Sequence, residues 1–133
     1  MKKVIFLLII TAILFTIDNN PVYSQQSGEK VFWMATVEVS LGKLEAYHSF
    51  NYSELIPLME EHGYKPVAVW QTIIGNIEEV IFVAEFDNIA AYHKARISLL
   101  NSIEWQDVSR KFDSITKSIS TKLLSATSYS KLQ

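Results

Sequence analysis

Two apolar segments joined by a short turn form the clearest pattern in the chain. Val67–Ile73 and Val80–Phe86 are rich in β-branched and aromatic residues, which favour strands, and Gly75-Asn76 between them can adopt the positive φ of a tight turn. The pattern predicts a β-hairpin. Alternation along its second strand places on one face Ile81, Val83 and Glu85, and on the other Val80, Phe82, Ala84 and Phe86. Both faces are therefore apolar, and both need a cover.

The residues before the hairpin alternate first and then change to a helical period. Val31–Val39 predicts a strand with apolar residues on both faces. Apolar residues at helical offsets predict a first helix over Lys43–His62, which Gly63 ends in the left-handed conformation. Pro57 lies inside this helix and has no N–H for the preceding turn, so we expect a kink or a restart around Asn51–Ser53.

The residues after the hairpin predict a second helix. Asp87 or Asn88 is expected to cap it, and it runs to about Leu100. Its apolar spacing predicts a stripe that consists of Ile89, Tyr92, Arg96 and Leu99.

A third helix and a last strand follow. Asn101 with Glu104 three residues later resembles a capping box, and the helix that it begins is expected to run to about Ser118. Thr121–Thr127 is interpreted as a fourth strand. The resulting order is the split βαβ, or ferredoxin-like, pattern βαββαβ of an α+β fold with a four-stranded antiparallel sheet.

In such a fold the helices cover one face of the sheet and leave the other face bare. An apolar face of four strands is larger than the few hundred Å² of contiguous apolar surface that a monomer exposes. A second copy of the chain is the simplest cover. We therefore expect a homodimer formed through the sheet face.

The chain begins with a pattern typical of a secretory signal peptide. Lys2 and Lys3 precede the apolar run Val4–Ile17, which is shorter than the roughly 20 residues of a spanning helix. We predict cleavage after Ser24 and export to the periplasm or beyond, with no stable membrane insertion afterwards; an uncleaved anchor is the alternative. The expected organisation is a signal peptide over 1–24, a flexible arm over 25–30, one domain over 31–128 and a tail over 129–133.

Composition narrows the function classes. The 133 residues are 49% hydrophobic and 12% aromatic, which is enough for the core of one domain. With a net charge of −2 and no block of Lys or Arg, the chain is not expected to bind nucleic acid. It contains no Cys, so its core or a partner subunit must stabilise it. The sequence has no nucleophile elbow, phosphate loop or local histidine pair, and we expect neither a metal site nor a cofactor.

Several short segments, in this order and spacing, resemble the NIPSNAP family of the dimeric α/β-barrel superfamily. They are Glu61-His62-Gly63-Tyr64, Trp70-Gln71-Thr72 with Gly75 after it, Phe86-Asp87 and Glu104-Trp105-Gln106. The resemblance covers about Met34 to Thr127. It implies a ferredoxin-like protomer whose sheet packs on that of its twin, in a family with no generally established reaction. The export signal and Pro57 depart from the eukaryotic relatives, which are known chiefly as mitochondrial proteins.

Five side chains are candidates for a ligand-binding site, namely His48, Trp70, Tyr92, His93 and Arg96. Trp70 could stack on a flat apolar ligand, although a core aromatic is the commoner role of such a residue. His93 lies beside Tyr92 on the second helix, which is expected to face the sheet where enzymes of the superfamily keep their pocket. The ordinary alternative for each histidine is a solvated helix position, with His62 near a helix C-terminus.

No catalytic set can be named, and the candidates are His93, Tyr92 and Glu85. A carboxylate in an apolar strand must reach solvent or a partner, and Arg96 is one possible partner for Glu85. An ordinary salt bridge is the alternative to a general base there. Haem-degrading relatives use an Asn, a Trp and a His together, and Val31–Val39 contains no Asn.

Two functions from different classes follow. The first is an exported homodimeric domain that binds a small apolar ligand or a protein partner. The second is a cofactor-independent monooxygenase acting on an aromatic or quinol substrate, with Trp70, Tyr92 and His93 near the substrate. A third possibility is that the pocket is filled by its own side chains and only the barrel interface matters.

Overall fold

The computed structural model describes residues 29–132. The predicted signal peptide over 1–24, its cleavage site and most of the predicted arm over 25–30 lie outside the described residues. The elements are β1 (Val31–Glu38), a 3₁₀ turn η1 (Leu41–Lys43), α2 (Leu44–Phe50), a π turn η2 (Asn51–Leu55), α3 (Ile56–Glu61), β2 (Lys65–Gln71), β3 (Glu79–Phe86), α4 (Ile89–Leu100), α5 (Ile103–Ile115) and β4 (Ser118–Ser125).

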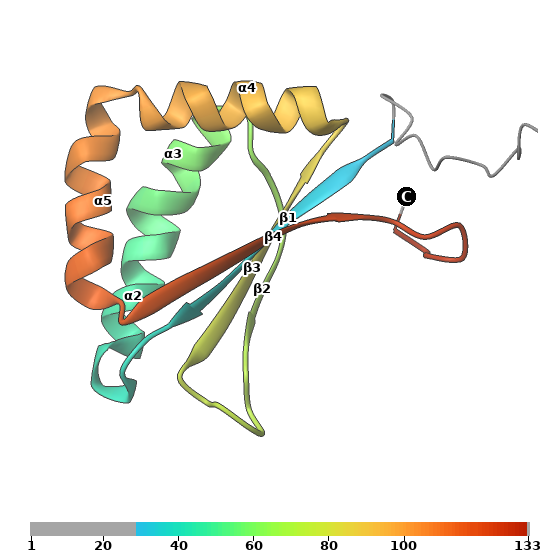
Figure 1. Ribbon diagram of the computed structural model, residues 1–133. Helices are drawn as coiled ribbons and strands as arrows, with labels where there is room; N and C mark the ends of the chain where they lie inside the picture. The colour runs from blue at the N-terminus through green and yellow to red at the C-terminus, as the bar shows by residue number, and fades with distance from the viewer. Residues whose placement is uncertain (1–28, 133) are drawn as a thin grey trace, which may run out of the picture.

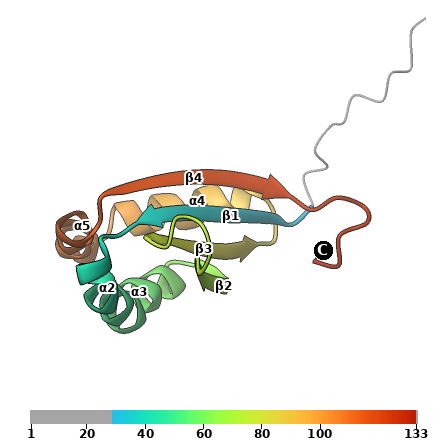
Figure 2. The same cartoon turned by 90° about the horizontal axis from the view of Figure 1, so that it is seen from below.

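The strands form one antiparallel sheet in the order β2-β3-β1-β4. Figure 1 views this sheet nearly edge-on, with α2, α3, α4 and α5 all on one side of it. Figure 2 shows the four strands side by side in the same order. The architecture confirms the predicted ferredoxin-like α+β fold, in which the helices leave one face of the sheet uncovered.

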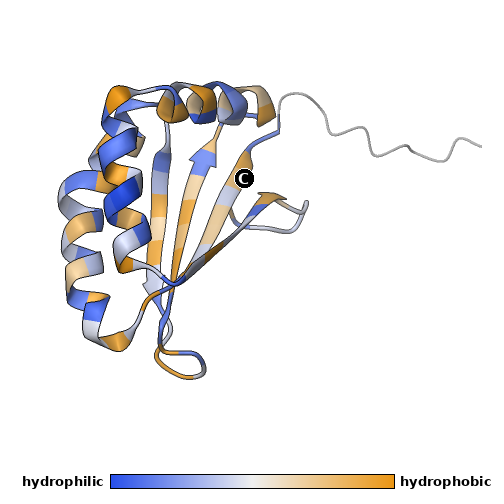
Figure 3. Cartoon of the chain, turned by 60° about the vertical axis from the view of Figure 1, so that its left-hand side comes forward, coloured by the Kyte–Doolittle hydropathy of each residue, from blue (hydrophilic) through white to orange (hydrophobic). Residues whose placement is uncertain are grey.

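Strand register separates the two faces of the sheet. Phe82 of β3 pairs with Ala35 of β1 and Val69 of β2, and this row faces the helices. The next row contains Ile81 with Trp70, and it faces away because successive side chains point to opposite faces. We call this surface, which no helix covers, the bare face. Its apolar members are Phe32, Met34, Ala68, Trp70, Ile81, Val83 and Leu124, of which Phe32 and Val83 are only 7% and 9% exposed in the single chain. The loop between β2 and β3, at one end of the molecule, also carries apolar residues (Figure 3). Two of them, Ile73 and Ile74, are exposed to solvent.

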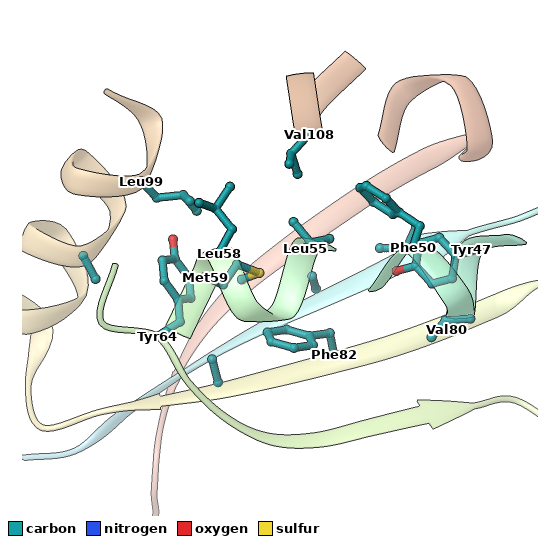
Figure 4. Close-up of a cluster of buried hydrophobic side chains, with 14 of the residues drawn as sticks. Tyr47, Phe50, Leu55, Leu58, Met59, Tyr64, Val80, Phe82, Leu99 and Val108 are labelled. Carbon is teal, nitrogen blue, oxygen red and sulfur yellow. The ribbon is translucent and has the colours of Figure 1, made fainter. Parts of the chain in front are cut away.

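The hydrophobic core lies between the helix-side face of the sheet and the helices. Its most deeply buried large side chains are Tyr47, Val39, Val80 and Phe86. Figure 4 shows helix residues packed over Phe82, among them Leu55, Leu58 and Met59. Because the chain has no Cys, this core provides the main stabilisation of the single protomer.

The first helical segment is interrupted as predicted. Residues Asn51–Leu55 form a π turn between α2 and α3, and Pro57 lies in the first turn of α3, where its missing N–H is tolerated. The segment ends with Gly63 at φ +94°, whose N–H donates to the Glu60 carbonyl while that of Tyr64 donates to the Met59 carbonyl. These two bonds form the Schellman motif, and they confirm the left-handed end predicted at Gly63.

The second helix begins where the sequence predicted. The Asn88 side chain accepts a hydrogen bond of 2.8 Å from the Ala91 N–H. Its buried face differs from the predicted stripe, because Ala95 and Leu99 are buried while Ile89 and Arg96 are exposed. The small alanine side chains of α4 let the helix lie close to the sheet. The predicted stripe left these alanines out of the buried face.

The capping box predicted at Asn101 and Glu104 is wrong. Asn101 is the C-cap of α4, and the N-cap of α5 is Ser102, whose hydroxyl donates back to the Leu99 carbonyl. The short connection leaves no room for a separate cap. In addition, α5 ends at Ile115, because the strand that follows it pairs with β1 from Ser118 onward.

The fourth strand exists but begins earlier than predicted. It spans Ser118–Ser125 instead of Thr121–Thr127. The Lys117 N–H donates to the Glu38 carbonyl, and this long-range bond sets the first ladder position. The register is therefore decided by pairing with β1, which strand propensity alone does not contain.

Candidate functional site

A cavity of about 280 Å³ lies between the helix-side face of the sheet and the helical layer. This volume is near the lower end of the range of small-molecule pockets, so the cavity fits a ligand of one or two rings. The sheet contributes five side chains to the cavity wall, namely Trp33, Ala35, Val37, Phe82 and Ile119. Tyr64, the residue before β2, also lines the cavity. The helical walls are Tyr47, Asn51, Leu55, Ile56, Met59, Arg96, Leu99, Leu100, Trp105, Ser109, Phe112 and Asp113.

The π turn shapes one wall of this cavity. A π turn inserts one extra residue into a helix and so shifts the face that points inward. Asn51 and Leu55, at the two ends of this π turn, both lie inside the core and against the cavity. The segment that the sequence marks as an interruption therefore contributes an amide side chain to the cavity wall.

Asn51 is 4% exposed and is the sole buried polar residue between positions 29 and 132. Its side chain forms a hydrogen bond with Tyr47, whose phenol is itself buried. Burial raises the pKa of Tyr47 and the bond to Asn51 opposes that rise, so the phenol is neutral near pH 7. An amide can form up to four hydrogen bonds, and the Tyr47–Asn51 pair therefore offers a polar contact to a bound molecule.

Aromatic rings make up much of the remaining wall. The Trp33 ring lies edge-on to Tyr64 and to Phe82, with centroid distances of 5.7 and 6.0 Å. On the helical side, Trp105 and Phe112 of α5 are half-buried and border the same cavity. Edge-to-face packing of this kind holds rings rigidly, so the cavity has a defined shape that suits a flat apolar molecule.

The predicted ligand residues are distributed over both sides of the sheet. Arg96 borders the cavity, whereas Trp70 is 56% exposed on the bare face and is not the core aromatic that its type predicts. His48 does not line the cavity, but its ring packs against that of Tyr47, which does. The His48 Nε2 is 3.0 Å from the Gln71 Oε1. The structure therefore does not bring Trp70 together with Arg96.

The candidates Tyr92 and His93 lie next to the cavity rather than on its wall. The Tyr92 ring packs on Phe86 at a centroid distance of 5.4 Å, and the exposed His93 ring lies 5.2 Å from that of Tyr92. The partner predicted for Glu85 is wrong, because Glu85 pairs with Lys30 at 3.2 Å on the bare face. Arg96 is on α4, across the sheet from that carboxylate.

Sequence reasoning missed Asn51, Tyr47 and Trp105 as site residues. Asn51 was noted as part of an interruption, and Trp105 only within the segment Glu104-Trp105-Gln106 that carries the family resemblance. A polar residue at a helix interruption, four residues after an aromatic one, is the signal that could have identified the first pair. Between residues 29 and 132, no group of three or more His, Asp or Glu side chains is placed to hold a metal ion. No helix in this same part of the chain is long and apolar enough to cross a membrane.

Two solved structures of similar fold come from proteins described as uncharacterised or of unknown function. A NIPSNAP family protein of unknown function from Agrobacterium tumefaciens superposes with a TM-score of 0.73 at 19% identity, covering 80% of this chain and 96% of that one. An uncharacterised NIPSNAP-like domain protein from Burkholderia xenovorans gives a TM-score of 0.71 at 16% identity, covering 77% and 90% of the two chains. At these identities the likeness establishes the fold alone.

A more distant neighbour has a named activity. SnoaB, a cofactor-independent oxygenase from Streptomyces nogalater, gives a TM-score of 0.58 at 11% identity, covering 78% of this chain and 97% of that one. No functionally curated protein matches the chain. The sequence model of the NIPSNAP family, however, matches residues 32–131, which is most of the chain. The protein therefore belongs to the NIPSNAP family, within the dimeric α/β-barrel superfamily.

Proposed function

We propose that the protein binds a small, largely apolar ligand in the cavity between the sheet and the helices. The observation that carries this proposal is the cavity itself, about 280 Å³ in volume and walled by rigid aromatic rings. Apolar walls supply affinity through burial of the ligand surface, and the Tyr47–Asn51 pair supplies a directional polar contact.

Two serines of α5 provide a matched test. Ser109 borders the cavity and Ser114 does not, although each hydroxyl donates to the carbonyl three residues earlier. Ser109→Leu should therefore fill the cavity, while Ser114→Leu adds the same side chain at an exposed position. Both variants are expected to fold, because neither serine lies in the deep core.

The purified protein is titrated with a panel of one- and two-ring aromatic compounds and medium-chain aliphatic compounds. Binding is followed by thermal shift and by the fluorescence of Trp33 and Trp105 in the cavity wall. We expect at least one compound to raise the melting temperature of the parent protein and of Ser114→Leu, and not that of Ser109→Leu. A panel with no effect on any of the three proteins would count against the proposal.

The same protein is proposed to form a homodimer through the bare face. Seven apolar side chains on that face have no helix over them, and Phe32 and Val83 among them are already buried in the single chain. The other five keep exposed area that a two-fold related copy would cover with an identical surface. The charged residues Lys65, Glu79, Glu85 and Lys122 lie toward the margins of this surface, where solvent can still reach them. A polar rim around an apolar centre is the usual anatomy of a stable interface.

Export is proposed from the sequence alone. The support is the lysine pair Lys2-Lys3 before the apolar run Val4–Ile17 and the polar residues after it. N-terminal sequencing of protein recovered from the periplasm or the medium should find Gln25 as the first residue. Recovery of the full-length chain from the cytoplasm would refute both the export and the cleavage site.

A cofactor-independent monooxygenase is the second candidate function. It is favoured by the fold likeness to the oxygenase SnoaB and by a cavity that borders a buried polar pair, Tyr47 and Asn51. Oxygen uptake in the presence of quinols and activated phenols separates this function from simple binding. Asn51→Ala should abolish any such turnover, whereas His93→Ala and Trp70→Phe, which change residues off the cavity wall, test the sequence-based assignment.

A further inference from the structure

Arg96 is a cation on an otherwise apolar part of the cavity wall. It lies on α4, which contains no Asp or Glu along its length, and its neighbours on the wall are Leu99 and Leu100. Arg96 is exposed at the mouth side of this wall, and within residues 29–132 its guanidinium forms no ion pair and no hydrogen bond, whereas six ion pairs form elsewhere in the same part of the chain. A cation beside an apolar cavity attracts an anion that can displace water from it.

A second donor lies near this guanidinium. The Tyr64 side chain is buried, and its hydroxyl points toward α4 in Figure 4. Burial raises the pKa of Tyr64 to about 12, with Tyr92 adding to the rise and Arg96 opposing it. The phenol therefore keeps its proton at neutral pH and can donate a hydrogen bond into the cavity.

The opposite charge lies at the other end of the wall. Asp113 borders the cavity close to the end of α5, and Figure 1 shows that this end lies away from the corner where α5 meets α4. An anionic group is disfavoured there and favoured beside Arg96. The distribution of charge thus gives the cavity a polarity along its length.

We propose that the ligand is a small apolar acid whose carboxylate lies between the Arg96 guanidinium and the Tyr64 hydroxyl, with its apolar body in the cavity beyond. The inference rests on the proposed function, because it specifies the chemistry of the molecule that occupies the same cavity. Arg96 supplies two parallel N–H donors, which match the two oxygens of a carboxylate. Tyr64 supplies a third donor and orients the group.

Matched probes that differ only in charge test the inference on the unmodified protein. Naphthoate and its primary amide, naphthamide, have nearly the same shape, and decanoate with decanamide forms the equivalent aliphatic pair. Isothermal titration of the purified protein should show the acid of each pair binding roughly tenfold more tightly than its neutral counterpart, the usual effect of a charge-assisted hydrogen bond.

Three variants identify the residue responsible. Arg96→Gln should remove the preference for the acid and leave binding of the amide unchanged. Arg96→Lys should keep part of the preference, because lysine retains the positive charge but lacks the two parallel N–H donors of the guanidinium. Lys94→Gln is the control, because it removes a positive charge two residues away on the exposed surface of the same helix. Circular dichroism and the melting temperature confirm that each variant is folded.

The outcomes separate this inference from the function on which it rests. If acid and amide bind equally, or if Lys94→Gln weakens acid binding as much as Arg96→Gln does, the cavity binds apolar ligands and the carboxylate assignment is wrong. If no probe of either pair binds, while the protein is folded, the proposed function fails and the inference fails with it. Tighter binding of the acid that disappears in Arg96→Gln alone supports both.

Discussion

Replacement of Trp70 by alanine is expected to dissociate the proposed homodimer. Trp70 is 56% exposed in the single chain and lies beside Ile81 on the bare face. A tryptophan side chain carries roughly 200 Å² of surface, so roughly 110 Å² of it remains in contact with water. At about 25 cal/mol per Å², burial of this area by a partner stabilises the dimer by about 3 kcal/mol.

A two-fold interface contains the residue twice, so the expected loss is about 5 kcal/mol once the smaller contribution of alanine is subtracted. This corresponds to an increase of three to four orders of magnitude in the dissociation constant, at about 1.4 kcal/mol for each order. Sedimentation equilibrium over a dilution series measures this constant for both proteins. Because Trp70 is mainly exposed in the single chain, the dissociated variant should remain folded.

Ile97→Ala is the matched control for this prediction. Ile97 is 61% exposed, an exposure similar to that of Trp70, but it lies on α4 and so on the helical side of the sheet. Its replacement should leave the dissociation constant unchanged. A parent protein that stays monomeric at high concentration, or equal effects of the two substitutions, would refute the assignment of the bare face as the interface.

Three further substitutions test separate features of the protomer. Gly63→Ala should lower stability by about 1 kcal/mol in chemical denaturation, since Gly63 has a φ of +94°, whereas Gly42→Ala, with no atom near its added methyl, should be neutral. Asn51→Leu should lower stability by about 2 kcal/mol, because the buried phenol loses its partner. Lys117→Met should reduce the melting temperature at pH 7, and the difference from the parent protein should vanish in acid. The reason is that the hydrogen bond from Lys117 lowers the pKa of Glu78 below 4.5. The stability that this bond contributes is therefore present above pH 4.5 and is lost as the Glu78 carboxylate is protonated.

Local patterns predicted most of the fold. The hairpin around Gly75 and the cap at Asn88 depend on residues that are close in sequence, and both are confirmed. The first strand of the hairpin is, however, Lys65–Gln71 instead of Val67–Ile73, and residues 72–78 form a loop longer than the predicted tight turn. The interruption near Pro57 follows from the chemistry of a single residue. The start of the last strand was misplaced because it is set by a bond between Lys117 and Glu38, which are far apart in sequence.

The candidate site was harder to predict for two physical reasons. Alternation showed that both faces of the sheet are apolar, but it could not show which face the helices cover. Trp70 was therefore expected either beside a ligand or in the core, and the structure places it on the bare face. Asn51 lies four residues after Tyr47 and so on the same helix face, but its polarity argues for a solvent-facing position, and its burial depends on the partner that Tyr47 supplies. Arg96 was named as a candidate and borders the cavity, although the sequence placed it in a buried stripe that the structure does not contain.

The single layer of backbone in β3 separates the ligand cavity from the outer surface of the sheet. Phe82 lines the cavity, and the adjacent Ile81 points the opposite way, so a change in the position of one residue moves the other. In a dimer closed through the bare face, occupancy of the cavity and self-association become coupled equilibria, and each alters the other by the same factor. A molecule that fits the cavity would then tune the assembly, and dilution of the protein would weaken its hold on that molecule.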